Sequence, residues 1–356
     1  MLGPHPGAGV RHFSLEMKNS RASGSVTVDD VAAHAGVSIK TVSRVLNNEP
    51  NISPKTRAHV QAAMAELKYQ PNPWARRLAS KRSDLVVLLY DNPSDNYLIN
   101  VQHGALDACR QYFHSLLLHP VDYRSPALAD DVLQLARQRA CAGLVLTPPV
   151  CDVPALIQAL DASDIPFVRL APFTPSARGL SVHTPDRHAA REMTAHLIAS
   201  GHRRIGYVKG HPDHGAAHER LLGFRDAMTA AGIAVDESLI EQGLHSFDSG
   251  VQAGRRLLAH GQRPSAIFAG NDDMAAGVLY AAHGAGVSVP TQLSVAGYDD
   301  TPLSQQTWPA LTTLRQPIKA MAFAAVEQLV SRTPDGASRT LDFALVVRDS
   351  TGPALA

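Results

Sequence analysis

The spacing of apolar residues along the chain changes at about residue 84. Beyond that point, short apolar runs alternate with stretches whose apolar positions recur at helical spacing. The runs predict strands over residues 85–90, 115–120, 142–147, 167–171, 204–210, 266–271 and 293–299. Helical patterns lie between most of them, for example over 186–200, 218–232 and 271–286. Alternating strands and helices predict parallel sheets that are covered by helices on both faces.

The length of this second part of the chain predicts two lobes. About 260 residues is large for a single sheet of this kind, so we expect two lobes with a cleft between them. Ligands of such sheets bind beyond the carboxyl ends of the strands. Polar residues near those ends are binding candidates, although Asn and Asp there also cap helices and form turns. The candidates are Asp91, Asn92, Arg169, Asn271, Asp272, Asp299 and Asp300.

Three short helices are predicted before residue 84. The first covers 28–34 and stops at Gly36, a residue suited to the end of a helix. Ser38 can cap the second, which carries Val42, Val45 and Leu46 on one stripe. Ser53 and Pro54 begin the third. Two short helices joined by a four-residue connection with glycine form a helix-turn-helix, so residues 26–70 predict a small all-α head.

The second helix carries side chains that can read DNA. In a helix-turn-helix this helix enters the major groove. Arg44 could bond guanine bidentately, Lys40 could donate to guanine or phosphate, and Ile39 could contact a thymine methyl group. The short hydroxyls suit phosphate oxygens; they are Ser38, Thr41 and Ser43. The spacing of these residues alone fits an ordinary capped surface helix about as well as it fits a DNA-reading helix.

Residues 71–83 predict either a plain linker or a helix that orders only on binding. Two prolines end the third helix, and the basic segment after them is too short to stay helical by itself in water. Leu78 stands among four basic residues in this segment. An apolar side chain between cations that pair with phosphates could act as a wedge in the minor groove of DNA.

The charge distribution separates the head from the rest of the chain. The formal net charge is +1 for all 356 residues, but residues 21–82 hold ten Lys and Arg against four acids, a net charge of +6. A basic head on a mildly acidic body suggests that only the head meets a polyanion.

Other features of composition exclude several classes of protein. With 45% apolar and 18% charged residues, the chain is typical of a soluble globular protein. Its longest clean apolar runs are far shorter than the roughly 18 residues that a membrane span needs. Residues 1–25 lack an apolar signal core and predict a disordered tail, in which Met17 could be the true start. Three cysteines without a CxxC pair disfavour disulfides and zinc, which suggests a reducing cytoplasm. We expect no metal and no cofactor.

An enzyme is the first alternative to a DNA-binding protein. The chain has no GxSxG, Walker A or HExxH motif and no GxGxxG that opens a helix after a strand. Acids at strand ends could suit a glycosidase. An exported sugar-binding protein is the second alternative, but neither class has a use for the basic head.

The head and the segment after it resemble the LacI/GalR family of bacterial transcription regulators. The resemblance rests on Val26, Thr27, Asp30–Ala32, Ala35–Ser38, Thr41–Asn47, Tyr69, Pro71, Asn72, Ala75, Arg76 and Leu78. It implies that Ile39, Lys40 and Arg44 read an operator and that Leu78 opens its central base step. It also implies DNA contacts by further residues, namely Ser38, Thr41, Ser43, Asn47, Tyr69, Asn72 and Ala75.

The resemblance continues through the body over 196–210, 219–228, 266–300 and 311–317. It implies a two-lobed body like a periplasmic sugar-binding protein, with an effector between the lobes. The residues it assigns to effector binding are Arg220, Asn271, Asp299, His245 and Arg169, with Asp91, Asp95 and Tyr97 on the first lobe. His245 stands where many members carry an aromatic ring. The sequence departs from the family after Val182, where either Pro185 or Asp186 could take the place of a usual Asp.

These expectations combine into one prediction. The chain is expected to be a cytoplasmic, homodimeric regulator, most simply a repressor, that binds a near-palindromic operator and responds to a small molecule. Carboxylates and hydroxyl partners favour a sugar or glycoside, whereas a nucleobase would want flanking aromatics in a chain that is only 5% aromatic. The predicted domains are a tail (1–25), a helix-turn-helix head (26–70), a hinge (71–83) and a two-lobed effector-binding and dimerisation body (84–356). No heptad-patterned tail follows, which favours a dimer over a tetramer.

Overall fold

The computed structural model describes residues 26–46, 52–67, 69, 83–174, 176–331 and 333–355. The chain divides into two compact units, residues 1–79 and residues 80–356, and each is described by itself. The predicted tail lies outside the described residues, as does the predicted hinge except for Ser83.

The described residues of the first unit form a head of three short helices, of which the first has the predicted bounds and the other two begin where the sequence predicts. They are α1 (Val28–His34), α2 (Ile39–Leu46) and α3 (Pro54–Glu66). The Thr27 hydroxyl accepts a hydrogen bond from the Asp30 backbone N–H, and the Asp30 carboxylate accepts one from the backbone N–H of Thr27. Gly36 adopts a φ of 59° after α1, a conformation that a residue with a Cβ rarely takes. Val31, Val42 and Val60 bring one residue of each helix into the head's buried core.

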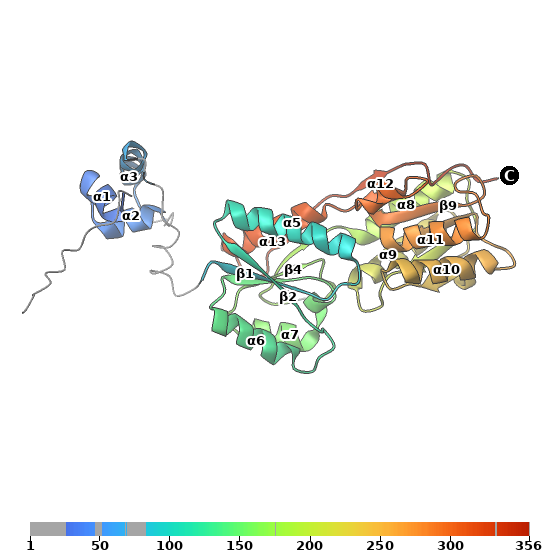
Figure 1. Ribbon diagram of the computed structural model, residues 1–356, viewed down its shortest axis with the longest axis horizontal. Coiled ribbons are helices and arrows are strands. Elements are labelled where there is room, and N and C mark those ends of the chain that lie inside the picture. Colours follow the sequence, from blue (N-terminus) through green and yellow to red (C-terminus); the bar gives the residue numbers. More distant parts are fainter. Residues whose placement is uncertain are drawn as a thin grey trace, which may run out of the picture. The chain divides into compact units, whose positions relative to one another are not determined.

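The second unit contains two six-stranded sheets, one in each lobe (Figure 1). The first lobe's sheet has the order β11-β5-β4-β3-β1-β2, with all neighbours parallel. Its strands are β1 (Leu85–Tyr90), β2 (Ser115–Pro120), β3 (Gly143–Leu146), β4 (Phe167–Leu170), β5 (Leu180–His183) and β11 (Ser338–Thr340). The second lobe's sheet has the order β12-β10-β9-β8-β6-β7. Its strands are β6 (Ile205–Lys209), β7 (Ile240–Gln242), β8 (Ala266–Ala269), β9 (Ser294–Asp299), β10 (Thr312–Arg315) and β12 (Ala344–Val346).

The predicted fold class, a helix-turn-helix head with a two-lobed α/β body, is confirmed. All seven predicted strands occur, and the one antiparallel pair among the described strands joins β10 to β12. The helix predicted over 218–232 begins earlier, at Gly215, and ends at Ala230.

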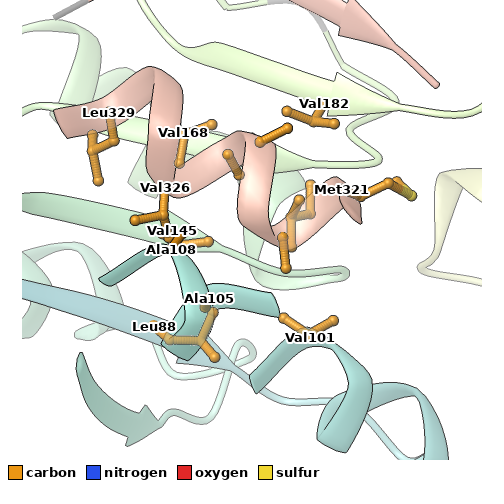
Figure 2. Packing of buried hydrophobic residues seen from close by; sticks show 14 of the residues in the cluster. Leu88, Val101, Ala105, Ala108, Val145, Val168, Val182, Met321, Val326 and Leu329 are labelled. Carbon is orange, nitrogen blue, oxygen red and sulfur yellow. The ribbon is translucent and has the colours of Figure 1, made fainter. Parts of the chain in front are cut away.

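Helices cover both faces of each sheet. In the first lobe, α5 (Asp95–Gln111) and α13 (Ile318–Val330) lie on one face, while α6 (Leu128–Arg139), η1 (Val150–Asp152) and α7 (Pro154–Asp161) lie on the other. Figure 2 shows Leu88 of β1 and Val101 and Ala105 of α5 in the core under α13. Val87 and Leu89 of β1 pack on the opposite face, which explains why this strand is a continuous apolar run.

The second lobe repeats the arrangement. One face carries α8 (Asp186–Ala199) and α9 (Gly215–Ala230), and the other carries α10 (Phe247–Ala259) and α11 (Asp272–Gly284). Two shorter elements, η2 (Glu237–Leu239) and α12 (Leu303–Gln306), complete the lobe.

Within the described residues, the chain passes between the lobes three times. The crossing segments are residues 184–185, 316–317 and 341–343, so α13 and β11 return to complete the first lobe. Two of them touch, because the Gln316 side-chain amide donates to the Thr184 hydroxyl at 3.3 Å.

Candidate functional site

The second helix of the head turns its polar edge outward. Val42 and Val45 are buried against the other helices, whereas Ile39 is 54% exposed and Lys40 is also exposed. A large apolar side chain in water at the start of a helix has no packing role in the head. Ile39 and Lys40 are therefore accessible to a partner, and their contacts with DNA stay a prediction.

The hydroxyl groups of this helix have local roles. The Ser38 hydroxyl accepts a hydrogen bond from the Thr41 backbone N–H at 3.1 Å and lies 2.9 Å from the Thr41 hydroxyl. Ser38 thus caps α2, and a phosphate contact would be an additional role. Ser43 and Arg44 are half-buried.

The remaining predicted DNA contacts divide into two groups. Tyr69 is buried in the core of the head, and its backbone N–H donates to Met64, so its ring is a packing residue in this structure. The other four lie outside the described residues; they are Asn47, Asn72, Ala75 and Leu78.

The two lobes of the body touch at the carboxyl ends of their strands. At the start of α5, the Ser94 hydroxyl and the Asn96 amide donate to the Asp273 carboxylate across the cleft, at 2.5 and 2.6 Å. Past β2, the Tyr123 hydroxyl donates to Asp213 at 2.5 Å. These contacts join residues from opposite lobes, and they define the rim of the predicted cleft.

A third contact between the lobes lies beside the crossing segments. Phe173, which follows β4, packs edge-on against His218 of α9, with ring centroids 5.9 Å apart. The backbone of Gly215 lies so close to Phe173 that a Cβ at position 215 would overlap the Phe173 side chain. The absence of a side chain at Gly215 therefore permits this approach of the lobes.

Arg220 forms the charged centre of the cleft. Its Nε donates to Asp186 at 2.8 Å and its Nη1 donates to the Gly270 carbonyl at 2.7 Å. Its guanidinium lies 3.6 Å from the centroid of the Tyr298 ring, and the Tyr298 hydroxyl also donates to Asp186. Asp186 is buried and occupies the first turn of α8. The structure thus places Asp186, rather than Pro185, beside the predicted effector residue.

Asp299 lies on the opposite side of Arg220. The Asp299 carboxylate is buried, with Oδ1 3.8 Å from Nη1 of Arg220, and this oxygen accepts no hydrogen bond from any described residue. Burial raises the pKa of Asp299 well above its usual range, although Arg220 opposes the shift. The residue has a φ of 109°, an unusual backbone conformation at the end of β9.

Two buried histidines complete the centre of the cleft. The rings of His214 and His245 have centroids 4.9 Å apart, and the Nε2 atom of each lacks a hydrogen-bond partner in the described part of the chain. Burial lowers the pKa of His214 to about 3 and that of His245 well below its usual range, so both are neutral at pH 7. A side chain at Gly210 would overlap the His245 ring.

Two predicted effector residues are already saturated by protein contacts. All three side-chain nitrogens of Arg169 donate within the first lobe, to the Cys151 carbonyl, to Asp152 and to Thr174, at 2.7–2.8 Å. The Asn271 amide caps α11 through its oxygen and donates to the His245 carbonyl and to Asp273. In this structure both residues act as supports of the cleft.

The first-lobe candidates differ in their positions. Tyr97 is fully buried near Asp299 and Arg220, and burial raises its pKa. Asp91 is half-buried; its carboxylate accepts from the Tyr123 backbone N–H, and its charge acts on His211. Asp95 is exposed in the first turn of α5. The structure therefore brings Tyr97 to the central cluster, places Asp91 at the rim and leaves Asp95 on the surface.

Sequence reasoning missed His214, Asp273 and Tyr298 at this site. His214 follows β6 in the segment HPDHG, and a polar residue beyond a strand end was the signal that could have found it. Asp273 and Tyr298 each neighbour a predicted candidate, and only the tertiary fold shows which of the two side chains faces the cleft.

Open space continues on both sides of the central cluster. One pocket of about 490 Å³ lies between Phe173, the crossing segment 184–185 and the starts of α8 and α9. A second of about 600 Å³ is lined by Asp299, by amide side chains such as Asn100 and Gln316, and by Lys319. Both pockets draw their walls from both lobes, as expected for a cleft.

Neither a cluster of metal ligands nor a membrane-spanning helix occurs in the described part of the chain. Within the described ranges, no group of three or more His, Cys, Asp or Glu could hold a metal ion. No helix that the structure describes is long and apolar enough to cross a membrane.

A helix-turn-helix head on a two-lobed body with a buried polar cleft defines a DNA-binding transcription regulator. Residues 27–72 match the family described as bacterial regulatory proteins, lacI family, and residues 194–351 match a periplasmic binding protein-like domain. The chain is 31% identical to catabolite control protein A of Priestia megaterium over 92% of its own length and 99% of that protein. It belongs to the LacI family, as the sequence predicts.

Solved structures agree with this membership. The complex of transcriptional regulator CelR with cellobiose matches with a TM-score of 0.70 and 30% identity, over 91% of this chain and 99% of that one. A lac repressor dimer bound to operator and the anti-inducer ONPF matches with a TM-score of 0.69 and 32% identity, over 92% of this chain and 100% of that one. The chain is therefore a DNA-binding transcription regulator, and the alternatives of an enzyme and an exported binding protein are set aside.

Proposed function

We propose that this chain is a cytoplasmic, homodimeric repressor whose affinity for a near-palindromic operator depends on a sugar or glycoside bound between its lobes. The observation that carries the proposal is the buried cluster of Arg220, Asp299, His214 and His245 in the cleft, with three polar atoms that lack partners among the described residues. Buried polar groups without partners are costly, so a site that keeps several of them is suited to a polar ligand.

The chemistry of the cluster supports a carbohydrate. Arginine and carboxylate side chains held side by side can donate to and accept from neighbouring hydroxyl groups through charge-assisted hydrogen bonds. The matched CelR structure is a complex with cellobiose, which is consistent with a sugar in a related cleft.

Operator reading is assigned to α2. Ile39, Lys40 and Arg44 would contact base edges in the major groove, while Ser38, Thr41 and Ser43 would contact phosphates. The remaining DNA contacts are predictions from the family resemblance: those of Asn47, Tyr69, Asn72 and Ala75, and the insertion of Leu78 as a wedge in the minor groove.

Coupling between ligand and operator would pass through the arrangement of the lobes. The effector can shift the protein only by its difference in affinity for the two arrangements. The hydrogen bonds to Asp273 and Asp213 and the contact of Phe173 with Gly215 exist in one lobe arrangement and would change in another.

An exposed aromatic pair supports the homodimer. Phe247 of α10 and Tyr280 of α11 are both exposed on the second lobe and pack edge-on with ring centroids 5.7 Å apart. Exposed paired rings on two adjacent helices are typical of a protein interface. The matched lac repressor structure is a dimer on its operator.

The function can be tested with DNA from upstream of the protein's own gene. We expect the full chain to bind one fragment tightly at low salt, to lose affinity steeply as salt rises, and to bind a single half-site far more weakly than the complete palindrome. A mono- or disaccharide that stabilises the protein in thermal denaturation should also change this binding. Equal affinity for the half-site and the complete site would contradict a two-headed dimer.

Arg44→Ala tests the reading helix. We expect the substitution to cost about 1–3 kcal/mol at one base position of the operator, because a bidentate contact to guanine is lost. Fluorescence anisotropy against operators mutated one base pair at a time measures this, and a thermal melt of the variant checks that the head remains folded. An equal loss on every sequence would show that Arg44 contacts phosphate instead.

A further inference from the structure

A short segment after β4 reaches from the first lobe to the second. Residues 171–174 leave the carboxyl end of β4, and Phe173 packs against Gly215 and His218 of α9. Phe173 is nevertheless 54% exposed, so burial of its own ring does little to hold it in place. Ala171 has a φ of 43°, a left-handed conformation that a residue with a Cβ keeps only when its surroundings fix it. The position of Phe173 must therefore be set by other contacts of the segment.

The carboxylate of Asp152 supplies such contacts. Asp152 ends η1 in the first lobe, and its Oδ1 accepts hydrogen bonds from the backbone N–H of Phe173 at 3.0 Å and from that of Thr174 at 2.9 Å. The Thr174 hydroxyl donates to the same oxygen at 2.8 Å. Hydrogen bonds to an ionised acceptor are stronger than those to a neutral one. Asp152 thus fixes two consecutive residues at the point where the segment faces the second lobe.

Arg169 makes this arrangement rigid. The side chain is 2% exposed, and its Nη2 donates to Asp152 at 2.7 Å and to the Thr174 hydroxyl at 2.8 Å. Its Nη1 donates to the Thr174 carbonyl and its Nε to the Cys151 carbonyl, both at 2.7 Å. A buried ion pair is stable only when further hydrogen bonds satisfy its remaining groups, as they do here. Because Arg169 belongs to β4 and Asp152 to η1, the segment is tied to two elements of the first lobe.

The contact that this network supports is sensitive to small movements. Phe173 meets the second lobe where Gly215 has no side chain, and its ring lies edge-on to His218 with centroids 5.9 Å apart. Van der Waals attraction falls steeply when a gap opens between two surfaces. A small shift of the segment would therefore remove the contact between the lobes at this rim.

We infer that Asp152, Arg169 and Thr174 form a clasp that positions Phe173 against α9. Asp152 is then a positioning residue for the arrangement of the lobes in this structure, and the inference assigns Arg169 to the contact between lobes and not to a ligand. It goes beyond the proposed function, because the clasp acts in the same way whatever molecule occupies the cleft. Weakening the clasp lowers the fraction of molecules in which the lobes meet at this rim.

The labelling rate of a thiol introduced at position 216 measures how closely the lobes meet. Ala216 is half-buried at the start of α9 and lines the same pocket as Phe173. The three cysteines of the chain are all buried, so Ala216→Cys adds one accessible thiol to the full chain. Reaction with a thiol reagent is followed by peptide mass spectrometry, which identifies each labelled site. Labelling of Cys109 and Cys141 reports unfolding.

Asp152→Asn in the Ala216→Cys chain tests the clasp. We expect the introduced thiol to react about tenfold faster, because the segment loses hydrogen bonds to a charged acceptor. Thr174→Val removes a hydroxyl group but keeps both charges and the branched shape, so it should raise the rate about threefold. An unchanged rate in both variants would overturn the inference.

Asp161→Asn is the matched control. Asp161, at the end of α7, holds the following segment in a similar way, since its carboxylate accepts from the Ser176 hydroxyl at 2.9 Å and from the backbone N–H groups of Ala177 and Arg178 at 3.2 Å. This carboxylate supports no residue that contacts α9 in the described structure. Its substitution should leave the labelling rate of Ala216→Cys unchanged, and an acceleration equal to that of Asp152→Asn would contradict a specific role for the clasp.

Phe173→Gly separates positioning from general loosening. It should raise the labelling rate of Ala216→Cys by itself, and adding Asp152→Asn should then change the rate by less than about twofold, because the clasp acts through Phe173. The same acceleration by Asp152→Asn with and without Phe173, or faster labelling of Cys109 and Cys141, would show a merely structural role and refute the inference. None of these measurements uses an effector or an operator, so their failure is distinguishable from failure of the proposed function.

Discussion

Gly215→Ala should weaken effector binding by about 10- to 100-fold and reduce the response of operator binding to the effector. The new Cβ would overlap Phe173, which belongs to the opposite lobe, so the two lobes could not approach as they do here. Overpacking of this kind costs about 1–3 kcal/mol. Alanine suits the helical position, so α9 itself should not be weakened. Titration calorimetry and operator release measure the two effects.

Phe173→Gly provides the control for this contact. The atom nearest to the new Cβ is the Cβ of Phe173, which alanine would keep and glycine removes. The double variant should therefore bind effector like Phe173→Gly alone, and restoration would show that the two residues act through one contact between the lobes. If Gly215→Ala binds effector like the wild type, or if Phe173→Gly fails to restore binding, the close approach at this rim does not control the cleft.

Arg220→Met should destabilise the body by about 3–5 kcal/mol and abolish effector binding. The substitution leaves Asp186 and Asp299 buried with no cation beside them, and an uncompensated buried charge is far more costly than a lost surface contact. Denaturant titration of the variant measures the change in unfolding free energy. Adding Asp186→Asn removes one of the two charges and should recover part of the loss.

The neighbouring ion pair of Arg187 with Asp226 provides a matched control. It has similar geometry, with Nε of Arg187 2.6 Å from the carboxylate, but both side chains are exposed. Arg187→Met should therefore cost at most about 1 kcal/mol. If the two substitutions destabilise the protein equally, burial is not what makes the Arg220 cluster important.

The helices and strands of this protein were predictable because they depend on the local pattern of apolar and capping residues. β1 is a continuous apolar run since helices pack on both of its faces, and the head helices begin at Ser38 and Ser53 because these hydroxyls satisfy backbone N–H groups. The same local rules placed Asp299 at a strand end, in the region where the cleft lies, whereas Arg220, within α9, was assigned by the family resemblance.

The roles of the candidate side chains were less predictable. Arg169 and Asn271 match the pattern of binding residues, yet their polar atoms are used by Asp152, Thr174 and the end of α11. His214, by contrast, carries no motif, and its nitrogen without a described partner becomes visible only when α9 and the loop with His245 meet.

The sequence alone was enough to predict the helix-turn-helix head, the two-lobed α/β body and the family, because periodicity, capping and motif spacing are local properties of the chain. Only the tertiary structure decided which polar atoms at the cleft are satisfied by protein and which remain for a ligand. That distinction depends on contacts such as Asp186 with Arg220 and Ser94 with Asp273, whose partners are far apart in sequence. Hydrogen bonds and burial across such distances follow from how the lobes pack, and no local pattern encodes them.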